Sequence, residues 1–231
     1  MRLPWSSGGI NWRYAIGEVL LIVIGVLIAL TASDWQDRRV RRQNETALLR
    51  EIHSSLSVDL DALEAQRDRF RQLQSRLDVL VPYLQSSEPY ADSLDVYFGS
   101  VYGSSGGFEP NTAAYESLRS QGIQLISNQA LRSHIARVYE QTYSSIDRSL
   151  EIGGDVVLQI LRPYFLQHFR DLRFGQNATP LDYSSLRQCV DFQNVLSYRL
   201  QVVRQNHLPR FDRGISEVRD LIDALEQELG T

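Results

Sequence analysis

The four histidines are the side chains of this sequence best suited to metal or proton chemistry: His53, His134, His168 and His207. A metal site on a helix needs another His, Cys or carboxylate on the same face, three or four residues away. Three of the four have no such neighbour, and His168 has only Asp171, three residues later, which alone does not make a metal site. His168, in the aromatic segment YFLQHFRD, is the candidate ligand for a haem or pigment, although a lone histidine on a long helix usually has a structural role. We therefore expect no metal and no cofactor.

Other catalytic patterns are also missing from the sequence. It contains no nucleophile elbow, P-loop, dinucleotide-binding fingerprint or zinc-protease motif. The glycine-rich stretch 103–107 lacks the lysine and the following helix of a phosphate cradle. Two carboxylate pairs, Asp59 with Asp61 and Glu226 with Glu228, have the spacing of solvated helix faces. We expect a protein that is not an enzyme.

Residues 14–32 form the longest apolar run, YAIGEVLLIVIGVLIALTA, with Glu18 as its one charge. A helix of this length is about 28 Å long, close to the roughly 30 Å of a bilayer's hydrocarbon core. The run therefore predicts a transmembrane helix. Aromatic rings at both ends and a basic cluster after the second end are expected to anchor it at the lipid–water interfaces. These residues are Trp12, Tyr14, Trp35, Arg38, Arg39, Arg41 and Arg42.

One stripe of the predicted span combines a carboxyl group with small residues: Glu18, Gly25, Ala29 and Ala32. The pair Gly25-x-x-x-Ala29 allows close approach of a neighbouring helix, so this stripe is expected to be a transmembrane packing seam. Glu18 then faces a partner helix. Alternatively, it is hydrated within a turn of the interface, or it belongs to an ion or proton pathway.

The apolar core of the span is longer than that of a signal peptide, and cleavage after Ala32 would place Leu30 where a small residue is required. We therefore expect an uncleaved anchor. Four arginines closely follow the span, whereas two arginines and the amino terminus precede it. This single-charge difference favours a cytoplasmic C-terminal domain and leaves a periplasmic one open. Beyond Gln43 the chain has 18 arginines and 25 acidic residues, so nucleic acid is not an expected partner.

Residues 33–231 are expected to form one helical extramembrane domain, and residues 1–13 an irregular lead-in. Leucines spaced by three, four and seven, uninterrupted by Gly or Pro, predict that the membrane helix continues to about Pro82. Residues 86–109, rich in Ser, Gly and Tyr, are expected to be a long loop with a short helix at about 92–98. The loop aromatics either dock on a partner or pack onto the bundle. They are Tyr97, Phe98, Tyr102 and Phe108.

Helix caps delimit two further helices. Asn111 or Thr112 is expected to cap a short helix that ends at Gly122. Ser127 or Asn128 is expected to cap the longer helix that follows.

That longer helix is expected to loosen at 153–154 and to kink at Pro163. After a polar interruption at 174–183, a last long helix is expected to be capped by Asp191 and bent at Pro209. No stretch alternates convincingly enough for a strand. The predicted fold class is all-α, with an N-terminal transmembrane helix that continues into an antiparallel bundle of long helices.

Two segments carry a recognisable pattern: YAIGE before the span, and a helix of the type Tyr-x-x-Leu-x-x-x-Gly followed by Leu-Ile-x-Asn. The matching residues are Tyr14, Ala15, Ile16, Gly17 and Glu18, then Tyr115, Leu118, Gly122, Leu125, Ile126 and Asn128. Together they resemble a group of bacterial single-pass membrane proteins of unknown function. The resemblance implies an inner-membrane protein with one span and implies no activity or substrate.

Two functions are compatible with these features. The first is a non-catalytic accessory or scaffold subunit that stabilises a larger membrane complex of the respiratory or photosynthetic type. The second is a membrane-anchored helical sensor whose bundle responds to a ligand or partner. The expected partners are the lipid bilayer and either other membrane-protein subunits or a second copy bound through the transmembrane helix.

Overall fold

The computed structural model describes residues 12–103 and 106–230, and side chains from Glu18 onward. It divides into a first unit that ends at Ala47 and a second unit that begins at Leu48. Most of the expected lead-in, residues 1–11, lies outside the described residues, as do the side chains of Trp12 and Tyr14.

The first unit consists, where it is described, of the N-terminal part of helix α1, which spans Trp12–Gln85. The predicted helix over 14–32 is therefore confirmed, as is its continuation to about Pro82; the helix ends three residues later, at Gln85. Ten large apolar side chains between Val19 and Leu30 are 47–75% exposed. The described residues contain one helix long and apolar enough to span a membrane, and this is it.

The second unit is built from helices and one small sheet. After the remainder of α1 come α2 (Leu94–Gly103), α3 (Ala113–Gln121), the 3-10 turn η1 (Ile123–Leu125), α4 (Gln129–Arg137), the π-helical segment η2 (Val138–Thr142), α5 (Tyr143–Asp155), the π-helical segment η3 (Val156–Leu161) and α6 (Arg162–His168). Strands β1 (Phe169–Arg173) and β2 (Asn177–Pro180) precede α7 (Tyr183–Gln188), α8 (Val190–Val202), the π-helical segment η4 (Val203–His207) and α9 (Leu208–Leu229). The predicted all-α class is confirmed.

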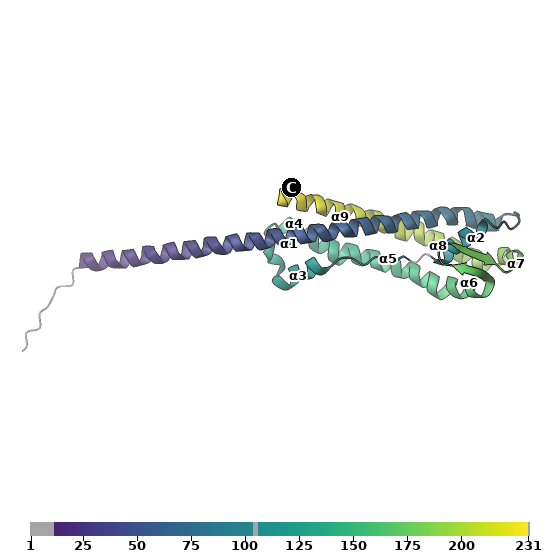
Figure 1. The fold of residues 1–231 in the computed structure, drawn as a ribbon, viewed down its shortest axis with the longest axis horizontal. Coiled ribbons are helices and arrows are strands. Elements are labelled where there is room, and N and C mark those ends of the chain that lie inside the picture. Colours follow the sequence, from purple (N-terminus) through teal and green to yellow (C-terminus); the bar gives the residue numbers. More distant parts are fainter. Residues whose placement is uncertain (1–11, 104–105, 231) are drawn as a thin grey trace, which may run out of the picture. The chain divides into compact units, whose positions relative to one another are not determined.

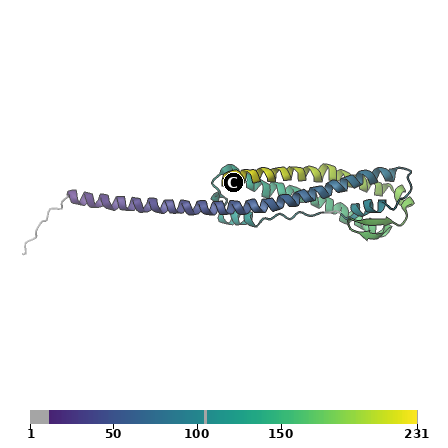
Figure 2. The same cartoon turned by 45° about the horizontal axis from the view of Figure 1, so that its top comes forward.

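Three long helical columns lie side by side in this unit (Figures 1 and 2): α1 from Leu48 onward, α4 to α6, and α8 to α9. The last column runs antiparallel to α1, because Arg204 pairs with Asp78 whereas His53 pairs with Glu226. The middle column instead runs parallel to α1. Residues 106–112 make this possible because they carry the chain back along the bundle as an extended segment.

The core follows the predicted apolar stripe of α1. Eight of its large side chains are at most 3% exposed: Leu49, Ile52, Leu56, Leu63, Phe70, Leu73, Leu77 and Leu80. They recur at helical spacing, so one face of α1 packs against the other two columns. Burial of such side chains is the main stabilising contribution to the fold.

Two of the three π-helical segments come just before a proline. Segment η3 precedes Pro163, and η4 precedes Pro209. A proline removes the backbone donor for the residue four positions earlier and clashes with that residue's carbonyl, and a widened turn accommodates both effects. The loosening expected at 153–154 therefore lies a few residues later, over 156–161.

The observed helix N-caps match the predicted one at α4 and differ from the predictions at α3 and α8. The side chain of Asn128 caps α4 by accepting hydrogen bonds from Ala130 N and Leu131 N at 3.1 and 3.2 Å. Thr112 occupies the N-cap position of α3 without a side-chain cap bond. Asp191 lies in the first turn of α8, whose N-cap is Cys189, because the short helix α7 already ends there.

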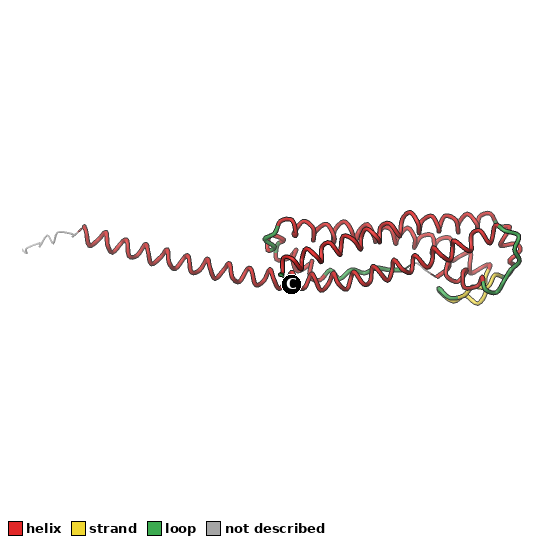
Figure 3. The backbone as a smooth tube through the Cα atoms, turned by 90° about the horizontal axis from the view of Figure 1, so that it is seen from above, coloured by secondary structure: helices red, strands yellow, loops and turns green. Residues whose placement is uncertain are grey.

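The stretch 169–180 forms a hairpin, which corrects the expectation of a chain without strands. Its two strands pair antiparallel, with Phe169 opposite Pro180 (Figure 3). Helix α2, which confirms the short helix expected at about 92–98 within the stretch 86–109, packs directly onto this hairpin. The backbones meet at Gly99 and Gly103, where an added Cβ would overlap the backbone nitrogens of Asn177 and Gly175. The backbone N–H of Gly175 also donates to the carbonyl oxygen of Gly99 at 3.1 Å.

The aromatic side chains of 86–109 pack inward. Of the two interpretations of this stretch, the structure therefore supports packing onto the bundle over docking on a partner. Phe98, Tyr102 and Phe108 are buried, and Tyr97 is half-buried. The ring of Phe98 lies 5.1 Å from that of Phe169. For the three buried rings this packing argues against the docking role, because their apolar area is already used within the bundle.

Candidate functional site

The four histidines lie apart from one another, each in its own environment. His53 Nε2 is 3.2 Å from a carboxylate oxygen of Glu226, and His134 Nε2 is 3.6 Å from one of Glu217. His168, the candidate haem ligand, lies with its ring centroid 4.3 Å from that of Tyr164. Among the residues whose placement is described, no group of three His, Cys, Asp or Glu side chains could hold a metal ion.

The predicted seam is open along its described length. Glu18, Ala29 and Ala32 are exposed, and no atom lies within 4 Å of the position that a Cβ on Gly25 would occupy. A larger residue at position 25 would therefore disturb nothing inside this chain.

The basic cluster after the span is also exposed, at Arg38, Arg39, Arg41 and Arg42. The guanidinium of Arg39 lies 5.6 Å from the ring centroid of Trp35, which is itself 65% exposed. Such an amphipathic pair suits a lipid–water interface.

Asp59 does not lie on a solvated face, contrary to expectation, because it is only 2% exposed. Its carboxylate accepts the backbone N–H of Asn111 at 2.9 Å and the hydroxyl of Tyr143 at 2.8 Å. Burial raises the pKa of Asp59, while these two hydrogen bonds act in the opposite direction. The carboxylate therefore ties both the extended segment 106–112 and α5 to α1.

His207 is the most enclosed histidine, with 2% exposure. One ring nitrogen is 2.7 Å from the hydroxyl of Ser149, and the ring stacks on Phe70 at 4.3 Å. Burial lowers the pKa of His207 to about 4, with smaller contributions from the positive charges of Arg199 and Arg210. The imidazole is therefore neutral at physiological pH.

This burial predicts a loss of stability in mild acid. The unfolded imidazole binds a proton near pH 6.5 and the folded one only near pH 4, so the unfolded state takes up more protons between these values. The resulting fall in the free energy of unfolding is about 2 kcal/mol at pH 5. Urea unfolding of the full chain in detergent at pH 7 and pH 5 measures it. His207→Gln should lose this part of the pH dependence and His53→Gln should keep it; equal pH dependence in all three proteins would contradict the assignment.

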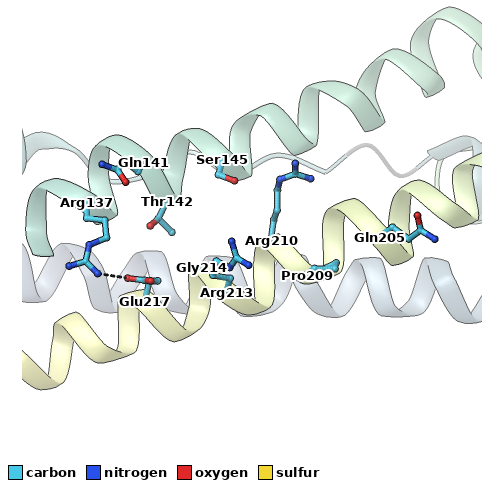
Figure 4. Close-up of a pocket in the computed structure, with 10 residues that line it drawn as sticks. All are labelled: Arg137, Gln141, Thr142, Ser145, Gln205, Pro209, Arg210, Arg213, Gly214 and Glu217. Atoms are coloured by element: carbon cyan, nitrogen blue, oxygen red, sulfur yellow. Dashed lines mark ion pairs between the residues drawn. The ribbon is translucent and has the colours of Figure 1, made fainter.

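A polar pocket of about 520 Å³ lies between the column formed by α4, η2 and α5 and the column formed by η4 and α9 (Figure 4). Its wall combines three arginines, one glutamate and several uncharged polar groups. The lining residues are Arg137, Gln141, Thr142, Ser145, Gln205, Pro209, Arg210, Arg213, Gly214 and Glu217. The volume lies within the range of small-molecule sites. The sequence analysis did not predict this pocket.

The comparisons with known proteins give one finding. The model of a family of unknown function (DUF6090) matches residues 18–154, which include most of α1 and the elements through α5. No match was found among curated proteins, and none among solved structures. Because the family model covers more than half of the chain, this protein belongs to the DUF6090 family of unknown function.

Proposed function

We propose that this protein is a non-catalytic, single-pass accessory subunit that stabilises a larger complex in the bacterial inner membrane. In this proposal the N-terminal part of α1 is the anchor, and the bundle from Leu48 onward is the extramembrane domain, on the cytoplasmic side. The partners are other membrane-protein subunits, of a respiratory or photosynthetic type of complex.

The observation that carries the proposal is the exposure of the apolar run. Ten large apolar side chains between Val19 and Leu30 find no cover within the chain. In water this surface would be strongly unfavourable, at about 25 cal/mol for each Å². Lipid and neighbouring transmembrane helices supply the missing cover, and intramembrane acids such as Glu18 usually face protein or water.

In this proposal the packing seam is the surface at which a partner helix contacts the span. Gly25 and Ala29 let a neighbouring helix approach closely, and the space beside Gly25 is open. Helices in lipid associate mainly through such packing, since lipid tails leave little hydrophobic driving force between them.

Gly25→Leu is expected to reduce co-purification of partner subunits at least fivefold, because its side chain fills the space that a partner helix needs. The measurement is quantitative mass spectrometry after mild detergent extraction of tagged protein from native membranes. Val23→Leu, on the opposite face of the helix, is the matched control and should leave recovery unchanged. Undiminished recovery with Gly25→Leu, or recovery of the tagged chain alone from wild-type membranes, would rule out this accessory role.

The pocket of Figure 4 favours a second candidate, a membrane-anchored sensor whose bundle responds to a bound ligand. A ligand acts as a signal only if it binds two conformations of the bundle with different affinity. Hydrogen exchange of the purified full chain, with and without ligand, would reveal a changed bundle if the sensor role holds.

A further inference from the structure

Two guanidinium groups in the pocket of Figure 4 are not neutralised by acidic side chains. Within the described part of the chain, neither Arg210 nor Arg213 forms an ion pair, and Arg210 donates to the carbonyl oxygen of Asn206 at 3.4 Å. The two arginines are three residues apart on α9 and therefore share one face. Like charges at this spacing repel one another, and an anion between them would remove the repulsion.

The acids of α9 nearest in sequence are engaged elsewhere. Asp212 pairs with Arg71 on α1 at 3.3 Å. Glu217 lies 3.7 Å from Arg137 (Figure 4) and 3.6 Å from His134. With three arginines and one glutamate, the pocket carries a net charge of about +2, although the chain beyond Gln43 has an excess of acidic residues.

The opposite wall provides neutral hydrogen-bonding groups. Thr142 and Ser145 contribute hydroxyls from η2 and α5, and Arg210 extends toward α5 from the other side (Figure 4). The two walls come close because Gly214 is small: a Cβ there would lie 2.6 Å from Ile146 Cδ1. Hydroxyls and guanidinium groups together form the donor set that a phosphate group requires.

The pocket also coincides with irregular helix geometry on both walls. Gln141 and Thr142 belong to the π-helical segment η2, and Gln205 belongs to η4. Widened π turns are rare and often occur at functional sites. Here they turn polar side chains of both columns toward one cavity.

We infer that this pocket binds a soluble small molecule that carries a phosphate group, with Arg210 and Arg213 as its charged ligands and Thr142 and Ser145 as neutral donors. A phosphate monoester carries close to two negative charges at neutral pH, which matches the charge of the site. The planar donor pairs of arginine fit phosphate oxygens in a bidentate manner.

Isothermal titration of the full-length protein in detergent with inorganic pyrophosphate tests this inference. A saturable heat with a stoichiometry near one is expected. Arg213→Gln and Arg210→Gln should each weaken binding about tenfold, since each removes a charge-assisted hydrogen bond. Arg219→Gln removes the same charge from α9 outside the pocket, where Arg219 pairs with Glu64, and should leave the affinity unchanged.

Three results would overturn the inference. The first is the absence of saturable heat at millimolar pyrophosphate. The second is an equal loss of affinity in Arg219→Gln, which would indicate unspecific attraction of anions. The third is Arg213-dependent binding only to vesicles that contain phosphatidylglycerol, which would make the ligand a lipid headgroup. The titration uses the purified chain alone, so it is independent of the accessory-subunit proposal.

Discussion

Gly99→Ala is expected to lower the free energy of unfolding of the bundle by about 3 kcal/mol. The added methyl group would overlap the backbone of Asn177, and backbone atoms cannot rotate away as a flexible side chain does. The hairpin must then separate from α2 and lose the hydrogen bond between Gly175 N and Gly99 O. Urea unfolding of the full chain in detergent, followed by far-UV circular dichroism, measures the change.

Gly154→Ala is the matched control for this experiment. Gly154 lies in α5, and no atom is within 4 Å of its added Cβ. Alanine is favoured over glycine inside a helix by about 1 kcal/mol, so this variant should be slightly more stable than the wild type. If Gly99→Ala also proved neutral or stabilising, the direct backbone contact between α2 and the hairpin would be wrong.

Replacement of two residues in the apolar run by aspartate is expected to abolish membrane integration. In the double variant Val23→Asp and Leu27→Asp each charge lies near the middle of the predicted span, at a cost of about 3 kcal/mol per residue. Flotation of membranes on a density gradient should then show most of the variant protein in the soluble or aggregated fraction.

The same two charges elsewhere on α1 provide the control. Val58 and Val79 are 60% and 44% exposed on the bundle, so aspartate at both positions should leave the protein in the membrane fraction. Retention of the Val23→Asp and Leu27→Asp double variant in membranes would show that this run is not what attaches the chain.

The long helix and its core face could be predicted because their signals are local and repeated. Leu56, Leu63 and Leu77 recur at helical spacing, and the structure buries all three completely. The cap at Asn128 is local as well, since its side chain accepts hydrogen bonds from the backbone N–H groups two and three residues later. Such features depend on neighbouring residues and not on the fold.

The hairpin could not be predicted, because both strands are short and the first does not alternate between buried and exposed residues. In Phe169–Arg173 only Phe169 is buried, and the paired strand has four residues. The strands are stabilised by packing against α2 through Gly99 and Gly103, about 70 residues earlier in the chain. Two glycines in a tyrosine- and serine-rich stretch indicate a loop unless this tertiary contact is known.

The pocket and the buried carboxylate were missed for a similar reason. Arg210 and Arg213 have the spacing of an ordinary solvated helix face, and only the approach of α5 encloses them. Asp59 is buried whereas Asp61, two residues later, is exposed. Helical spacing places Asp59 on the buried face, three residues after Leu56 and four before Leu63, but its hydrogen-bond partner Asn111 comes from the distant segment 106–112 and could not be predicted.

The most direct test of the membrane-anchored account is alkaline carbonate extraction of native membranes, combined with intact-mass analysis of the protein that is recovered. The account predicts that the chain stays in the membrane pellet, is released only by detergent, and retains residues 14–32. Recovery in the supernatant without detergent, or a mature chain that lacks its first thirty or so residues, would contradict it.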